Sequence, residues 1–197
     1  MKRTAGFTLV EMMIGVAIVA VLLTVAMPNF QAFIQNTQVR TAVENMQAGL
    51  NLARSEALRR NARVSFWIVD NLGETCARSA SGTSWVVSFD DPSAACHNAA
   101  SDSVVPRIIQ TRGGGDGSPN VTVSAKNALA AAATCITFNG FGGAETTCGG
   151  GTPIQTVQFR AASGGAAARK LDIRITSGGA VRQCDPDVAD SSKPAAC

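Results

Sequence analysis

A glutamate stands inside a long apolar stretch at the beginning of the chain. The sequence opens MKRTAGFTLVEMMIGVAIVAVLLTVAMPNF, so Glu11 lies four residues after Phe7 and is surrounded mainly by apolar side chains. A carboxylate inside a membrane-spanning helix raises the free energy of insertion by about 2.5–3.5 kcal/mol, so such a residue is usually retained for a function. Glu11 is therefore the first candidate functional residue.

The stretch around Glu11 has the length of a membrane span. Residues 7–27 are all apolar or small except for two threonines and Glu11, and about 20 such residues cross a bilayer as a helix. Lys2 and Arg3 precede the stretch, so the positive-inside rule predicts a cytoplasmic N-terminus and a domain on the other side of the membrane. A secretory signal peptide is the alternative, but it fits poorly because Pro28 stands where small cleavage-site residues should be.

After Pro28 the helical pattern continues with only one apolar face. Its apolar residues recur at alternating spacings of four and three. The pattern predicts one helix over residues 7–60, with Pro28 as the position of any kink. Residues 7–30 would form a transmembrane or filament-core helix, and residues 31–61 an amphipathic half that lies on a sheet. The apolar face consists of Val39, Val43, Met46, Leu50, Ala53 and Ala57.

Beyond Asn61 the pattern changes to the alternation that is typical of β-strands. Short connections rich in glycine favour antiparallel pairing, and the amphipathic half-helix is expected to cover one face of the sheet. The sequence thus predicts an α+β fold, in which the second half of a long N-terminal helix packs on an antiparallel β-sheet domain over residues 62–197. The expected strands are Arg63–Val69, Ser84–Phe89, Val104–Gln110, Asn120–Ser124, Thr134–Phe138, Thr156–Arg160, Leu171–Thr176 and Val181–Cys184.

All six cysteines lie beyond the apolar stretch. They form no CxxC pair, and His97 is the only histidine in the sequence, so a typical zinc site is not predicted. An even number of cysteines in an exported domain indicates disulfides. Six cysteines allow fifteen connectivities, of which we favour the sequential one, because each bridge would close a short surface loop and contribute about 3 kcal/mol. The expected pairs are Cys76–Cys96, Cys135–Cys148 and Cys184–Cys197.

Neither composition nor motifs indicate catalysis or a strongly charged partner. The formal charge of +3 falls to +1 without Lys2 and Arg3, so any polyanion would need a local cluster of cations. Cys96 and His97 are adjacent, and their side chains would point in opposite directions in an extended segment. The GGGDG stretch at 113–117 lacks the lysine and hydroxyl of a phosphate loop, and the DDP stretch at 90–92 is typical of a turn. We therefore expect no enzyme, no cofactor and no metal site.

The N-terminal residues resemble the class III leader of type IV pilins and type II secretion pseudopilins. The resemblance rests on GFTLVE after a short basic leader, followed by the apolar helix and Pro28. The remainder resembles the GspH/FimT group of minor pilins in three stretches, CITFNGFGG at 135–143, LDIRITSGG at 171–179 and VRQCDP at 181–186.

The resemblance implies a processing site and a role for the carboxylate. A prepilin peptidase would remove residues 1–6 by cutting after Gly6, and Phe7 would become an N-methylated N-terminus. Glu11 would then act in filament assembly, where it can neutralise the new amine of a neighbouring subunit, since an isolated charge in a dry environment is unfavourable.

The implied function is that of a minor pilin or pseudopilin that co-assembles into a type IV pilus or a type II secretion pseudopilus. The sequence leaves both machines open. The implied partners are other pilins or pseudopilins, inner-membrane assembly proteins and the membrane. The implied location is the bacterial inner membrane, with a single pass and a periplasmic C-terminal domain.

A DNA-binding minor pilin for natural transformation is the alternative function. The chain also resembles FimT-like minor pilins, some of which bind double-stranded DNA through a C-terminal GRxR motif. Here the stretch is 179–182, with Ala180 in place of the first arginine. Because side chains alternate between faces of a strand, Arg174 need not lie beside Arg182, and aspartates in the tail would oppose a phosphate backbone. Solvated surface charge is the preferred interpretation of these cations. The candidate DNA-binding residues are Arg182, Arg174, Lys170 and Arg169.

Overall fold

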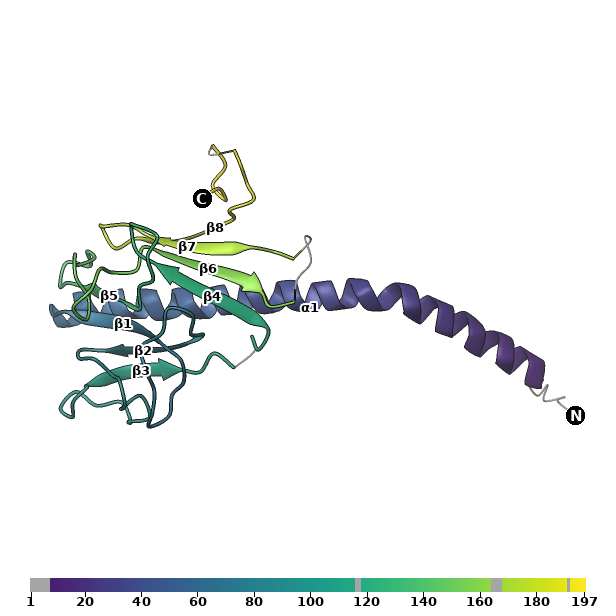
Figure 1. Ribbon diagram of the computed structural model, residues 1–197, viewed down its shortest axis with the longest axis horizontal. Helices are drawn as coiled ribbons and strands as arrows, with labels where there is room; N and C mark the ends of the chain where they lie inside the picture. The colour runs from purple at the N-terminus through teal and green to yellow at the C-terminus, as the bar shows by residue number, and fades with distance from the viewer. Residues whose placement is uncertain (1–7, 116–117, 164–167, 191) are drawn as a thin grey trace, which may run out of the picture. The chain divides into compact units, whose positions relative to one another are not determined.

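The structure, a computed structural model, contains one helix and eight strands in the residues that it describes (Figure 1). These are residues 8–115, 118–163, 168–190 and 192–197, with the backbone alone for 25–29 and 32. The chain divides into two compact units, Met1–Ile34 and Gln35–Cys197. The α+β class predicted from the sequence is confirmed.

The helix α1 spans Leu9–Arg60, and the strands that follow form two sheets of four strands. The strand orders are β3-β2-β1-β5 and β4-β6-β7-β8, and all pairings are antiparallel. The strands are β1 Val64–Val69, β2 Ser84–Ser88, β3 Ile108–Arg112, β4 Val121–Lys126, β5 Cys135–Phe138, β6 Thr156–Ala161, β7 Leu171–Ile175 and β8 Val181–Cys184.

Two details differ from the sequence-based expectation. A single sheet was expected from consecutive pairing, but β5 pairs with β1, so the strands separate into two sheets. The third strand begins at Ile108 and not at Val104, because Val104–Arg107 forms a turn in which the N–H of Arg107 donates to the carbonyl of Val104 at 2.7 Å. Pro106 lies in this turn and has no N–H for a strand ladder.

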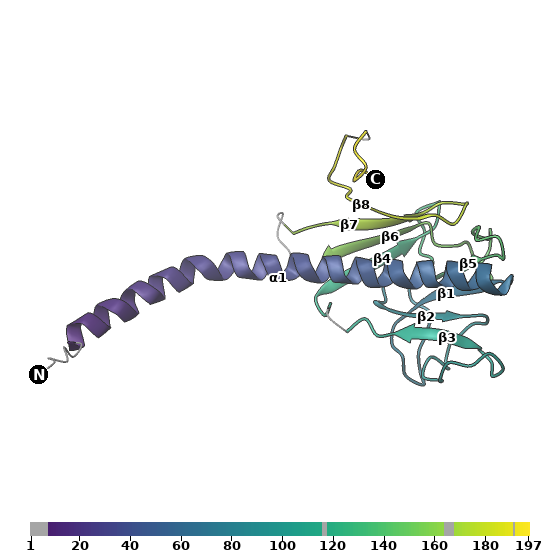
Figure 2. The ribbon, with the colours of Figure 1, turned by 180° about the vertical axis from the view of Figure 1, so that it is seen from behind.

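The core of Gln35–Cys197 lies between the second half of α1 and the inner faces of the two sheets. The six residues predicted to form the apolar face of the helix are all at most 2% exposed. Gly49 permits this close packing, since a Cβ there would lie 2.7 Å from Phe66 and 2.8 Å from Trp85. Figure 2 shows this part of the helix running across the strands of both sheets.

The outer face of the first sheet is covered by loops that disulfides hold in place. Three pairs join the cysteines, Cys76–Cys96, Cys135–Cys148 and Cys184–Cys197, which are the sequential pairs expected from the spacing. The first two bridges pack in a second apolar cluster with Trp67 and Val86 on this outer face. The third bridge lies elsewhere and closes the C-terminal tail, which follows β8 of the second sheet.

Candidate functional site

The residues of the predicted cleavage site, Gly6 and Phe7, lie outside the described residues, and so do Lys2 and Arg3. The description begins at Thr8, directly before α1. The assignment of the cleavage site therefore stays a prediction.

Glu11 lies exposed in the first turn of α1, and its backbone is capped by Thr8. The N–H of Glu11 donates to the hydroxyl oxygen Oγ1 of Thr8 at 3.3 Å, and the N–H of Met12 donates to the Thr8 carbonyl at 3.2 Å. A threonine that is followed three residues later by a glutamate is a capping-box signal. The spacing of Thr8 and Glu11 in the sequence thus contains a signal for the start of the helix at Thr8. An acidic residue in the first turn also stabilises the helix dipole.

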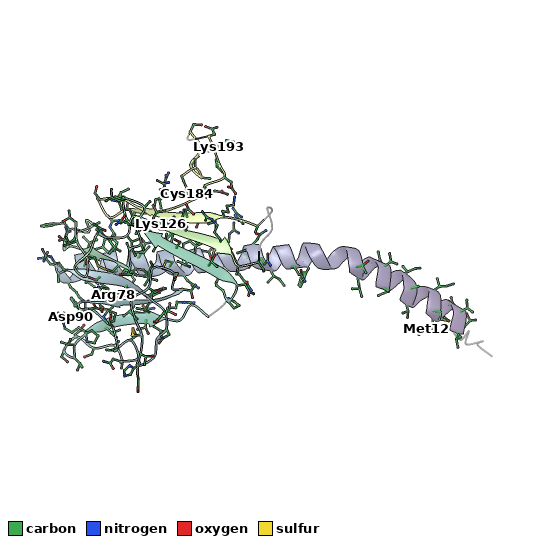
Figure 3. The ribbon with its side chains drawn as sticks, in the orientation of Figure 1. Met12, Arg78, Asp90, Lys126, Cys184 and Lys193 are labelled. Atoms are coloured by element: carbon green, nitrogen blue, oxygen red, sulfur yellow. A yellow bond between two sulfur atoms is a disulfide. The ribbon has the colours of Figure 1, made fainter. Side chains whose placement is uncertain are left out.

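The described apolar side chains that follow Glu11 are exposed and are not buried by residues of their own unit. Met12 is 62% exposed, Val16 67% and Leu22 63%, and a Cβ at Gly15 would meet nothing within 4 Å. Figure 3 shows the side chains around Met12 projecting away from the helix axis. In the part of the chain that the structure describes, no helix reaches the combined length and hydropathy required for a membrane span.

A line of cations crosses the outer face of the second sheet. Thr156 pairs with Lys126 on one side and with Arg174 on the other, and Arg174 pairs in turn with Arg182. Residues directly opposite each other in neighbouring strands point to the same face. The neighbouring positions Val157 and Ile173 are buried in the core, so the line faces solvent. Figure 3 marks Lys126 and Cys184 on this sheet.

Arg174 lies directly opposite Arg182, a point that alternation along the strand had left open. Alternation determines which residues of one strand share a face. The register between β7 and β8 determines which residues of the two strands lie opposite each other on the same face. A tight turn sets this register: the N–H of Thr176 donates to the Ala180 carbonyl at 3.0 Å, and Gly179 adopts a φ of 78°. Two like charges directly opposite each other destabilise a sheet, and in the described residues neither arginine has an ion-pair partner.

Two of the three other basic residues near this line, Arg160 and Lys170, form ion pairs. Arg160 forms an ion pair of 2.7 Å with Asp172, which is only 3% exposed. Lys170 reaches Asp187 in the tail at 2.9 Å. The backbone N–H of Arg169 donates to the side-chain oxygen of Asn36 at 2.9 Å, and Arg169 itself is exposed. The structure therefore brings Arg174 and Arg182 together and adds Lys126, for which the sequence contained no signal because it lies on a distant strand.

The cysteine and the two aspartates considered for catalysis take part in structural contacts, which are a disulfide, an ion pair and a turn. Cys96 is buried in a disulfide with Cys76, and His97 beside it is exposed. The guanidinium of Arg107 donates hydrogen bonds of 2.7 and 2.8 Å to Asp90 and thereby lowers the pKa of Asp90. Asp91 accepts from the N–H and the hydroxyl of Ser93, which is turn geometry. Within the described residues no group of three or more His, Cys, Asp or Glu side chains is arranged to hold a metal ion.

Comparison with known proteins finds similarity over both parts of the chain. Residues 42–179 match the family model described as type II transport protein GspH, and residues 1–27 match the prokaryotic N-terminal methylation motif. A fimbrial protein of Pseudomonas aeruginosa is 42% identical over 65 residues, which are 33% of this chain and 42% of that protein. A probable minor fimbrial protein of Dichelobacter nodosus is 38% identical over 84 residues, which are 42% of this chain and 49% of that protein.

The chain therefore spans less than half the length of these relatives. Among solved structures, the type IV minor pilin FimU of Pseudomonas aeruginosa aligns with 81% of this chain and 97% of its own, at 16% identity and a TM-score of 0.47. A second crystal form of FimU aligns with 77% of this chain and 97% of its own, at 14% identity and a TM-score of 0.45.

Proposed function

The chain belongs to the GspH family of pilins and pseudopilins, and on this premise we propose that it is a minor subunit that co-assembles into a type IV pilus or a type II secretion pseudopilus. Proteins of this family are structural components, not enzymes, and assemble with other pilins. The observation that carries the proposal is the contrast within α1. The apolar face of its second half is buried in a folded domain, whereas the apolar side chains described in its first half are exposed.

Processing would precede assembly. The match of residues 1–27 to the methylation motif supports cleavage by a prepilin peptidase between Gly6 and Phe7, followed by N-methylation of Phe7. Cleavage would leave the new amine next to Thr8, the residue that caps α1. The positively charged amine of Phe7 and the carboxylate of Glu11 would then be four residues apart in the sequence, which is about one helical turn.

The first half of α1 would occupy the inner membrane before assembly. Glu11 is the only charged residue from 8 to 34, and the exposed apolar side chains need lipid or neighbouring helices to remove them from water. The N-terminus would stay in the cytoplasm and the disulfide-bonded domain would lie in the periplasm, where disulfides persist. Inner-membrane assembly proteins would move the helix from lipid into the filament core.

In the filament core, Glu11 would neutralise the N-terminal amine of a neighbouring subunit. An ion pair in a dry environment is far stronger than the same pair at a surface, and one charge left alone there is strongly unfavourable. The carboxylate would thus select the register of the incoming helix. The capping of the Glu11 N–H by Thr8 supports this role, because it holds the first helical turn in place.

Filament incorporation of a charge-neutral variant tests this function. Glu11→Gln should insert into the membrane and be processed, but its amount in the sheared filament fraction should fall about tenfold or more. Glu44→Gln is the matched control, because Glu44 is an exposed glutamate of the same helix outside the apolar segment. Equal recovery of both variants would contradict the assembly role of Glu11.

Deletion of the gene separates the two machines. Loss of surface pili with normal protein secretion would assign the chain to a type IV pilus. Loss of secretion with normal pili would assign it to a type II secretion system.

DNA binding by the second sheet is a second candidate function, favoured by the unneutralised line of Lys126, Arg174 and Arg182. Three cations on one solvent-facing surface can contact phosphates without reading the base sequence. Each phosphate contact contributes about −0.9 to the slope of log affinity against log salt concentration. Three contacts thus predict weak binding with a shallow slope of about −3.

A gel-shift titration of the protein with duplex DNA at two salt concentrations tests this candidate. Arg182→Ala should weaken binding and reduce the slope by about one unit, and Ala180→Arg should do the opposite. Arg112→Ala is the control, since this exposed arginine lies on the first sheet. Absence of a shift at low salt would reject DNA binding and leave the structural role. An equal effect of the control would reject the second sheet as the DNA-binding surface.

A further inference from the structure

Hydrogen bonds at the end of β7 show which backbone groups of its neighbour β8 face away from the sheet. The N–H of Ile175 donates to the carbonyl of Gln155, on the β6 side, at 2.9 Å. The N–H of Thr176, the next residue, donates to the carbonyl of Ala180, on the β8 side, at 3.0 Å. Neighbouring residues of a strand direct their backbone groups to opposite edges. Ile175 therefore has no backbone hydrogen bond with β8.

Two residues of β8 accordingly direct their backbone groups away from β7. Val181 lies opposite Ile175, so the N–H and C=O of Val181 and of Gln183, two residues further, point to the outer edge. The N–H of Asp185 agrees with this direction, because it donates to the carbonyl of Ala195 in the tail at 2.7 Å. In the described part of the chain, the outward groups of Val181 and Gln183 form no hydrogen bond. Figure 1 shows β8 at the border of the second sheet, with the tail extending from its end.

The other three border strands, β3, β4 and β5, are each joined to a segment outside their sheet. The bonds are Ser101 N–H to the Ile108 carbonyl of β3 at 2.9 Å, Ala125 N–H of β4 to the Ala80 carbonyl at 2.7 Å, and Glu145 N–H to the Thr137 carbonyl of β5 at 2.8 Å. Among the described residues, β8 has no such bond within its bounds. An uncovered border strand is a template for the addition of another strand. The open length runs from Val181 to Gln183.

Two arginines without ion-pair partners lie on the solvent face beside this edge. Arg174 and Arg182 are exposed and directly opposite each other. Neither forms an ion pair with any residue that the structure describes. Like charges in this position repel each other and destabilise the strand pair. A carboxylate brought to this face would therefore be attracted by both guanidinium groups.

The carboxylates of the C-terminal tail are engaged elsewhere. Asp185 accepts the N–H of Asp187 at 2.9 Å, and Asp187 also accepts a hydrogen bond from Lys170 at 2.9 Å. Asp190 accepts the N–H of Ser192 at 3.1 Å and its hydroxyl at 2.6 Å. None of the three forms an ion pair with the two arginines in the described structure. A carboxylate for the arginines would thus come from a partner.

We propose that an acidic, extended segment of a partner protein adds to β8 as an antiparallel strand and places a carboxylate beside Arg182. The partner residues opposite Val181 and Gln183 each exchange two backbone hydrogen bonds with them. The partner residue between these two lies opposite Arg182 at a position without backbone hydrogen bonds, where Cα atoms are about 4.5 Å apart. A glutamate there points to the same face as Arg182 and accepts charge-assisted hydrogen bonds from it.

Backbone and charge have separate roles in this interaction. The backbone hydrogen bonds of an added strand supply affinity for any extended chain, and the side chains select among chains. The arginines select a chain with a carboxylate at the central position. Because only two residues of β8 are open, a short peptide binds weakly. The contact requires neither assembly into a filament nor DNA.

Titration of the full chain in detergent with fluorescein-labelled peptides, followed by fluorescence anisotropy, tests the proposal. The probe is the peptide Thr-Val-Glu-Val-Thr, whose valines lie opposite Val181 and Gln183 when its glutamate lies opposite Arg182. Methylation of both valine nitrogens removes the N–H groups that face β8 and should lower the affinity about tenfold or more. Methylation of the glutamate nitrogen is the matched control, because its N–H faces away from β8, and should leave the affinity unchanged. Replacement of the glutamate by lysine should lower the affinity about tenfold.

Variants of the chain locate the contact. Arg182→Ala should lower the affinity for the unmodified peptide about fivefold. Arg112→Ala should not change it, since this exposed arginine lies on β3, a border strand of the other sheet. Gln183→Pro removes an outward N–H, and proline is accepted where the N–H side of an edge strand faces solvent. This variant should keep the far-UV circular dichroism of the wild type and lower the affinity about tenfold.

Three results would overturn the proposal. The first is no binding of the unmodified peptide, and the second is equal binding of the valine-methylated and glutamate-methylated peptides. The third is an equal effect of Arg182→Ala and Arg112→Ala. The comparison of the two methylated peptides uses the unaltered chain, so it decides the question even if Gln183→Pro does not fold.

Discussion

The two halves of α1 have the same backbone structure and opposite surroundings. Leu50 in the second half is completely buried, and Leu22 in the first half is 63% exposed. The first half contains apolar residues on every side, whereas the second half confines them to one face. Helix formation therefore does not explain burial, which depends on what lies against the helix. The first half has the composition of a buried element, and under the proposed function lipid or other subunits would bury it.

We expect the largest difference between the halves when one leucine in each is truncated to alanine and the free energy of unfolding is measured. Leu50→Ala should lower the free energy of unfolding of the domain by about 2–5 kcal/mol, because it leaves a cavity in the core. Leu22→Ala should change it by less than about 0.5 kcal/mol. Denaturation of the full chain in detergent, followed by the fluorescence of Trp67 and Trp85, measures both. Equal losses would show that the halves do not differ in this way.

Addition of one methyl group to a glycine should change stability in opposite directions in the two halves. Gly49→Ala should destabilise the domain by about 1–3 kcal/mol, since its Cβ would overlap the rings of Phe66 and Trp85. Gly15→Ala meets no neighbour and should stabilise its helix by about 0.5–1 kcal/mol. Unfolding of the domain measures the first change, and amide hydrogen exchange around position 15 measures the second. A stable Gly49→Ala domain would mean that the helix lies farther from the sheets.

Loss of the cap should affect the beginning of the helix alone. Thr8→Val removes the acceptor of the Glu11 N–H and should weaken the first turn by about 1 kcal/mol. Exchange of the Glu11 and Met12 amides should then become about fivefold faster, while the domain keeps its unfolding free energy. Thr24→Val is the matched control, since the Thr24 hydroxyl donates to the Val21 carbonyl inside the helix and caps no N–H group. Similar exchange in both variants would reject the capping role.

The smallest effect concerns Glu56 near the end of the helix. Hydrogen bonds from the guanidinium of Arg59, and then from Arg60, lower the pKa of Glu56. Because the pKa is lower in the folded state, the stabilisation is present above the unfolded value of about 4.3 and is lost as the pH falls through the folded value. Glu56→Gln should cost about 0.5 kcal/mol at neutral pH.

The same variant should match the wild type once the pH lies below the lowered folded pKa of Glu56, where both side chains are uncharged. Denaturant titrations at both pH values measure the difference. A loss that persists unchanged at low pH would show that Glu56 acts through packing and not through its charge.

Several features could be predicted from the sequence because they depend on residues that are close in the chain. The spacing of Val39, Val43, Met46 and Leu50 identified the buried face of the helix, since helical geometry places these positions on one side. The sequential disulfide pairs in the structure agree with the expectation from loop length. The leader, Glu11 and the apolar run indicated the family that the comparisons show. The Thr8 cap was equally local and could have been predicted from its spacing to Glu11.

Other features were decided only by the tertiary structure. The division into two sheets depends on the pairing of β5 with β1, and alternation of residues along a strand does not specify a partner strand. The line of Lys126, Arg174 and Arg182 exists because four strands, β4, β6, β7 and β8, are aligned in one register. Phe141 is a residue type that is common in cores, yet it is 90% exposed in a turn whose backbone N–H groups donate to Asn139. In each case the outcome depends on contacts between segments that are distant in the sequence, and local periodicity contains no information on those contacts.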